Sequence, residues 1–145
     1  MAGPNTDVIY SKSGDVSANG TTTMPVAMVT ATADYTGVSA NHVLVFTADA
    51  TNGGFIQRLR FQATGTCVAS VARIYLNNGS THTTATNNTF YGQVSLPAIT
   101  AINTSATAEI DYPMNFAINP AFTIWVGLGT TVAASWFCTA IGGKY

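Results

Sequence analysis

The stretch that decides the fold covers residues 74–108 and reads IYLNNGSTHTTATNNTFYGQVSLPAITAINTSATA, without one charged side chain. A second charge-free stretch lies between Asp111 and Lys144. Exposed helices carry Lys and Glu on the face that meets water, so these stretches are poor helix material. Thr and Asn must supply the wet surface instead, and Thr does this well on a strand because its branched Cβ suits the pleat. We therefore expect an all-β protein.

The composition of the whole chain excludes several classes of protein. Of its 145 residues, 8% are charged and 47% are hydrophobic, and the net charge is −1. Disordered chains combine low hydrophobicity with high net charge, which is the reverse. Five basic residues against six acidic ones do not make the basic surface that binds a nucleic acid, so we expect no nucleic-acid partner.

Alternating runs bounded by turn residues predict the strands. They cover residues 24–31, 42–48, 55–64, 67–76, 89–96, 109–115, 122–128 and 132–141, with a polar loop over 77–88 and an ambiguous loop or edge segment over 98–107. Within 55–64, we expect Phe55, Leu59 and Phe61 on one face, and Ile56 with the arginines on the other. About eight strands at this spacing favour a β-sandwich of antiparallel strands, and eight strands with long cross-connections are typical of a jelly roll.

The two ends of the chain differ from this pattern. Residues 1–22 (MAGPNTDVIYSKSGDVSANGTT) hold few large apolar side chains, so we expect an extended N-terminal arm before a single domain over 23–145. The tail 142–145 (GGKY) is a second candidate arm. No secretory signal is expected, because the first ten residues have neither a basic nor an apolar leader segment. Residues 116–143 are long enough to span a membrane, but Asn119, Pro120 and glycines interrupt them, so we expect no membrane.

Groups able to do chemistry are scarce. His42 and His82 are the two histidines, and no zinc, EF-hand or paired-cysteine motif is present, so we expect no metal and no cofactor. No nucleophile elbow occurs either. Cys67 and Cys138 lie in apolar strands, where we favour two reduced thiols over a disulfide. We expect a protein that is not an enzyme.

Glu109 and Asp111 are two residues apart on a predicted strand and therefore face the same way. Paired carboxylates can hydrolyse glycosidic bonds, which makes a small glycosidase a distant alternative. Arg58 and Arg60 have the same spacing on another strand. We favour a structural charge ladder between these four residues, which requires only that the two strands be near neighbours.

The aromatic residues bear on the kind of partner. Trp125 and Trp136 lie in the most apolar strands, where we expect them in the core; a sugar-binding platform would expose them instead. Tyr10, Tyr35, Tyr91 and Tyr145 are expected to be partly exposed, and Tyr is favoured at protein interfaces. This profile fits a protein whose task is to bind other proteins.

Three stretches of sequence carry a family resemblance. They are ARIYLNNGS at 72–80, NNTFYG at 87–92 with the Leu96–Pro97 pair, and WVGLGT at 125–130. From about residue 55 to the C-terminus, the chain resembles small structural proteins encoded among the head genes of tailed bacteriophages. The resemblance implies a capsid cement or decoration protein, with a jelly-roll-like body that forms a homo-oligomer (a dimer or trimer) and staples neighbouring subunits of the major capsid protein. It implies a location on the capsid exterior of the virion, after assembly in the host cytoplasm.

An arm that becomes ordered on the capsid adds buried area to each contact, and repetition over a symmetric shell adds avidity. The residues that we expect at the capsid contact are Pro4, Asn5, Thr6, Asp7, Val8, Ile9, Tyr10 and Lys12, with Lys144 and Tyr145 as a weaker second group. The alternative is a carbohydrate- or receptor-binding β-sandwich, such as a fibre head or a lectin-like module.

Overall fold

The protein is all-β in a computed structural model that describes residues 15–17, 26–32 and 34–145. Apart from a short 3₁₀ helix, η1 (Ala85–Asn87), every regular element of the described residues is a strand. The strands are β1 (Asp15–Ser17), β2 (Val26–Met28), β3 (Val43–Thr47), β4 (Gly54–Ala63), β5 (Ser70–Asn77), β6 (Asn88–Leu96), β7 (Glu109–Ile118), β8 (Thr123–Leu128) and β9 (Trp136–Lys144). The all-β expectation is confirmed.

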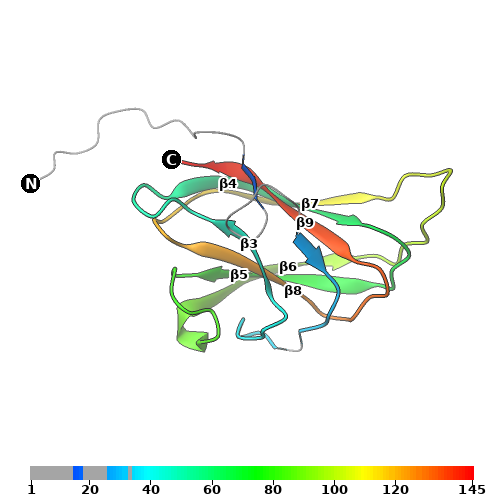
Figure 1. Ribbon diagram of the computed structural model, residues 1–145, viewed down its shortest axis with the longest axis horizontal. Helices are drawn as coiled ribbons and strands as arrows, with labels where there is room; N and C mark the ends of the chain where they lie inside the picture. Colours follow the sequence, from blue (N-terminus) through cyan, green and yellow to red (C-terminus); the bar gives the residue numbers. More distant parts are fainter. Residues whose placement is uncertain (1–14, 18–25, 33) are drawn as a thin grey trace, which may run out of the picture.

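The strands form two antiparallel sheets that pack face to face (Figure 1). One sheet has the order β1-β9-β4-β7, with β2 also on β9, and the other has the order β3-β8-β5-β6. From β2 onward the chain changes sheet at every connection except the one between β5 and β6. This wrapping of the chain between two antiparallel sheets is that of a jelly roll, so the expected sandwich is confirmed, and the structure supplies its strand order.

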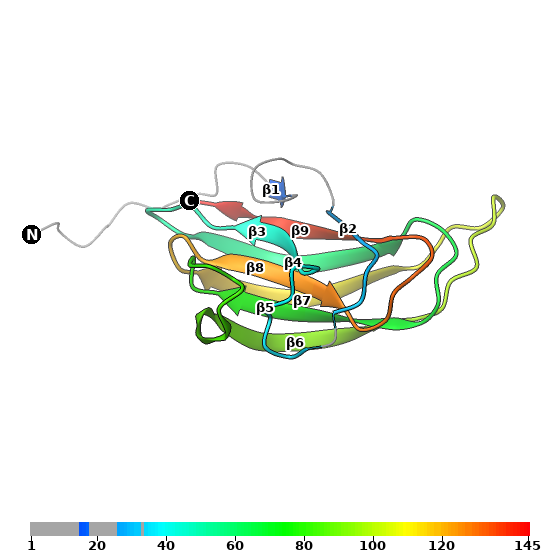
Figure 2. The same cartoon turned by 60° about the horizontal axis from the view of Figure 1, so that its bottom comes forward.

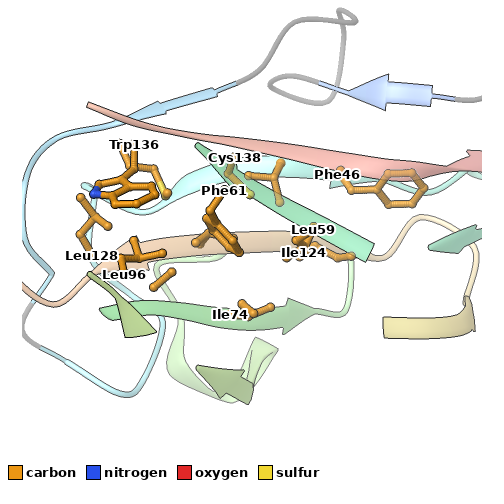
Figure 3. Packing of buried hydrophobic residues seen from close by; sticks show 14 of the residues in the cluster. Phe46, Leu59, Phe61, Ile74, Leu96, Ile124, Leu128, Trp136 and Cys138 are labelled. Carbon is orange, nitrogen blue, oxygen red and sulfur yellow. The ribbon is translucent and has the colours of Figure 1, made fainter. Parts of the chain in front are cut away.

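The core fills the space between the sheets (Figure 3). Alternate residues of β8, namely Ile124, Val126 and Leu128, point inward and are fully buried. They meet inward side chains of β4 and β9, among them Phe61 and Trp136. Burying one such side chain contributes roughly 1.5–3 kcal/mol, so this alternation stabilises the sandwich as a whole.

The face that we expected for Phe55 and Ile56 is wrong. Ile56 is fully buried in the core, whereas Phe55 is 36% exposed. The cause is a bulge at Gln57: Ile56 pairs with Gly142 and Arg58 with Ile141, so two residues of β4 advance against one of β9. An extra residue in a strand shifts every side chain before it to the other face.

Three expected strands begin two to four residues later than the sequence pattern indicated. The last strand begins at Trp136 instead of 132, because the backbone of Val132 bonds to Val29 in a loop. Among the described residues 26–31, the one strand is the three-residue β2, and β5 begins at Ser70. Cys67 forms an isolated bridge with Ile99 instead, at the base of the connection 97–108 that projects from one end of the body in Figures 1 and 2.

The expected arms do not lie wholly outside the sheets. Asp15–Ser17, within the expected N-terminal arm, form β1 on the edge of β9, and residues 1–14 and 18–22 lie outside the described residues. The expectation of a C-terminal arm is wrong. Gly142 and Lys144 belong to β9, and the Tyr145 amide donates to the Gly53 carbonyl at 3.2 Å. The tail is therefore part of a sheet.

Candidate partner-contact surfaces

Both ends of the described chain meet at the same end of the sandwich. Asp15 pairs with Gly142 near the end of β9, and Lys144 pairs with Gly54 (Figure 2). Pro4, Asn5, Thr6, Asp7, Val8, Ile9, Tyr10 and Lys12 lie outside the described residues. Asp15, the first described residue after them, nevertheless pairs close to the C-terminal contact group. That group consists of Lys144 and Tyr145, both half-buried. Asp15 and the C-terminal contact group, which are far apart in the sequence, therefore lie at the same end of the sandwich.

The four residues of the charge ladder are brought together by the pairing of β4 with β7. The Arg60 Nε lies 3.0 Å from Asp111 Oδ1, and Arg60 Nη1 lies 3.4 Å from Glu109 Oε2. Arg58 Nε lies 3.3 Å from the second Asp111 oxygen. The hydrogen bond from Arg60 lowers the pKa of Asp111, with help from the charges of both arginines. A glycosidase needs one carboxyl that stays protonated as the acid, and this environment has the opposite effect on Asp111.

The two histidines lie at different positions on the outer face of the β3-β8-β5-β6 sheet. His42 is buried, and its ring packs on Tyr75 with 4.7 Å between centroids. Burial lowers its pKa, against the charge of Asp34 and the carbonyl of Gly37. His82 is half-buried in the loop before β6. Among the described residues, no three His, Cys, Asp or Glu side chains are grouped as metal ligands.

Trp125 is not in the core, and its expected position is wrong. Its neighbours Ile124 and Val126 point inward, which places Trp125 on the outer face of β8. The ring stacks on His82 at 3.8 Å and 16°, and its Nε1 donates to Thr123 Oγ1 at 2.9 Å. Trp136 is fully buried, as expected. One face of this outward-facing, half-buried tryptophan is therefore occupied by an imidazole of the same chain.

A layer of polar contacts on this outer face was not predicted from the sequence. Arg73 Nη1 donates to the Thr32 carbonyl at 2.7 Å, and its guanidinium lies 4.4 Å from the Tyr35 ring centroid. The Tyr75 hydroxyl donates to the Asp34 carbonyl at 2.9 Å. Burial, the largest effect, raises the pKa of Tyr75 to about 12. These bonds hold the segment before β3 against the sheet, which is a structural task.

The edge strands β6 and β7 meet along one side of the sandwich. The ring of Tyr91 on β6 lies 5.3 Å from Phe116 and 6.3 Å from Tyr112, both on β7. Tyr91 is 38% exposed, and its neighbour Phe90 is 39% exposed. The expected partial exposure of Tyr91 is confirmed, as it is for Tyr35. This side presents aromatic rings together with two sheet edges.

Comparison of the chain with protein-family models, curated proteins and solved structures finds no match. Cys67 and Cys138 are free and buried, as expected. No helix within the described part of the chain is both long and apolar enough to cross a membrane. The function of the chain is therefore inferred from its fold and from the residues described above.

Proposed function

We propose that this chain is a non-catalytic virion protein that binds the outside of a phage capsid and cements neighbouring subunits of the major capsid protein. The observation that carries the proposal is the pairing of Asp15 with Gly142. This pairing attaches the C-terminal part of the expected arm to β9. The side chains of Trp136, Cys138 and Ala140 on β9 are fully buried in the core. A contact made by the arm on one capsid subunit is thereby joined to the rigid body that rests on another.

The direction of β1 suits this task. β1 runs antiparallel to β9 over three residue pairs, from Asp15 opposite Gly142 to Ser17 opposite Ala140. Tension applied along the axis of β1 would load its hydrogen bonds to β9 together, so these bonds would share the force instead of breaking one at a time. Such an attachment resists separation of two capsid subunits under outward pressure.

The charge distribution predicts how the attachment responds to salt. Of the eleven charged side chains, Arg58, Arg60, Glu109 and Asp111 are engaged with one another in the ladder. Because the net charge is only −1, attachment would depend mainly on shape, apolar contact and hydrogen bonds, which salt screens little. Many copies on a symmetric shell would add avidity to weak single contacts.

The test of binding is co-sedimentation with undecorated capsids at low and high salt. We expect the full-length protein to co-sediment at both salt concentrations and a variant without residues 1–12, which keeps β1, to bind more weakly. Absence of binding by the full-length protein would overturn the cement function. Undiminished binding by the shortened variant would overturn the role of the arm alone.

The carbohydrate-binding alternative has one observation in its favour. Trp125 is an outward-facing aromatic ring with Thr123 and Asn77 close by, and rings in such settings stack on sugars. His82 covers one face of the ring. A glycan array with the wild type, His82→Ala and Trp125→Ala decides the matter: a glycan retained by the first two and lost by the third would favour this alternative over the cement function.

A further inference from the structure

The four edges of the two sheets differ in how well they are protected against pairing with another chain. Within the described residues, the edge along β9 carries the three-residue strands β1 and β2 and no longer strand. β3 has five residues and an irregular register at Val45. β7 carries Glu109 and Asp111, with Pro113 and the positive φ of 52° at Asn115. Short strands, charges, proline and bulges are the usual devices that block edge pairing.

β6 lacks most of these devices. It is nine residues long, from Asn88 to Leu96, and contains neither a charged residue nor a proline. A bulge at Tyr91 interrupts the strand, since Ile74 pairs with Gly92 and Tyr75 with Phe90. Beyond the bulge, the five residues from Gly92 to Leu96 keep a regular register with β5. No other strand of the part of the chain that the structure describes pairs with the outer side of this segment, and β6 lies at the bottom of the sandwich in Figure 2.

The bulge also sets how the aromatic rings are placed. Phe90 packs toward the outer face, with its ring 5.3 Å from Tyr35 and 5.7 Å from Tyr75. Tyr91, one residue later, packs toward β7 and Phe116. Exposed apolar surface therefore lies on both sides of the β6 backbone, next to the regular segment. An edge strand with such flanks can bury apolar area as well as backbone groups when it pairs.

We propose that β6 pairs with β6 of a second copy of this chain, antiparallel and centred on Val94, so that two sandwiches form a dimer. Charge favours a second copy as the occupant, because an edge without charges meets its own copy without like-charge repulsion. In this register the exposed side chain of Gln93 lies opposite Ser95 of the partner subunit, a neutral pair able to form hydrogen bonds. Val94 meets its own copy on the half-buried face.

A twofold axis through β6 has a consequence for the assembly. It closes with two copies, because each chain has one such segment and uses it in the same way as its partner. The four-stranded sheets of the two copies would join into one sheet of eight strands. The dimer would form in the free protein, whether or not the protein binds a capsid.

The experiment uses sedimentation equilibrium of the full chain, with charges introduced at two exposed positions of the edge. In the proposed register, Gln93→Lys with Ser95→Lys places lysine opposite lysine twice, and Gln93→Glu with Ser95→Glu does the same with carboxylates. We expect each double variant to weaken self-association about tenfold or more. An equimolar mixture of the two should restore dimers of mixed composition, detectable by labelling one variant.

Matched controls keep the result interpretable. Gln62→Lys adds a charge at an exposed position of β4, away from this edge, and should leave the dimer intact. Circular dichroism of each variant checks folding, and recovery of the dimer on mixing cannot come from unfolded chains. A monomeric wild type at every concentration, or dimers unaffected by both charge pairs, would overturn the proposal. Loss of the dimer on deletion of residues 1–12 would show that the arm of another copy is the occupant, which also overturns it.

Discussion

Asp15 pairs with Gly142 across the edge of β9, so the segment that begins the described chain is fixed to the strand that ends it. Three residue pairs form this attachment, and β2 holds a separate part of the same strand, with Val26 opposite Cys138. β1 can therefore be detached while β2 stays paired with β9 at Trp136. This separation makes the role of β1 testable.

Proline at position 16 should release β1 and leave the sandwich folded. Proline removes a backbone donor and fixes φ near the value for polyproline, which opposes strand pairing in a three-residue strand. Because alternate residues of β9 direct their N–H groups to β1 and to β4, we expect amide hydrogen exchange in Val16→Pro to accelerate at those of Ala140, Ile141 and Gly142 that bond to β1, while exchange in β5 and β8 stays unchanged. The variant without residues 1–12 is the control, because it keeps β1. Unchanged exchange at all three residues would contradict the pairing.

Alanine at Gly127 should destabilise the fold. A Cβ at this position would collide with the His42 ring and with Thr32 Oγ1, both of which lie directly above β8. Such overpacking costs about 1–3 kcal/mol. Gly129→Ala is the matched control, because the nearest atom to its Cβ, Arg73 Nη2, is at an ordinary 3.4 Å. The midpoint of urea denaturation should be clearly higher for wild type and for Gly129→Ala than for Gly127→Ala. Equal midpoints would show that the His42 ring moves aside freely.

The burial of His42 predicts a loss of stability in weak acid. Its pKa is lowered in the folded state, so below the ordinary value of 6.5 the unfolded chain binds the proton more readily than the folded one. The contribution is fully present above pH 6.5 and decreases as the pH falls below it. We expect a loss of up to about 1 kcal/mol between pH 7 and pH 5.5.

The measurement is urea denaturation at both pH values for wild type and His42→Phe. Replacing His42 should flatten the pH dependence relative to wild type. An equally steep decrease in His42→Phe would assign the effect to other groups.

Removal of Arg60 should raise the pKa of Asp111. Arg60 donates the hydrogen bond that is the main cause of the lowered pKa, and Arg58 contributes only by its charge. Because the pKa of Asp111 is lowered in the folded state, its contribution to stability is present near neutral pH and decreases as the pH falls through the carboxyl range. Titration by NMR should show a larger rise in Arg60→Gln than in Arg58→Gln. Equal shifts would mean that charge alone sets the value.

The alternation of apolar and polar residues and the scarcity of charged residues predicted the strands, because both are properties of residues that are neighbours in the sequence. The ladder was predictable for the same reason: two pairs of opposite charges, each two residues apart, require only adjacent strands. The bulge at Gln57 was not, since nothing in the residues around it marks an extra position, and it exchanged the faces of Phe55 and Ile56.

The position of Trp125 was missed for another physical reason. The segment TIWVGL reads as uniformly apolar, and its inward face is set by Ile124 and Val126 packing against the other sheet. His82, which stacks on the outward ring, comes from a distant polar loop that Asn88 holds through a 2.6 Å bond to the His82 carbonyl. Such contacts between distant segments follow from the fold and have no local signal.

The most direct test of the cement function is the temperature at which filled capsids release their DNA. Undecorated particles are compared with particles saturated with the full-length protein, with the variant lacking residues 1–12, or with Val16→Pro. We predict that the full-length protein raises the release temperature and that both variants give a smaller rise at equal occupancy. A release temperature that full decoration leaves unchanged would contradict the cement function.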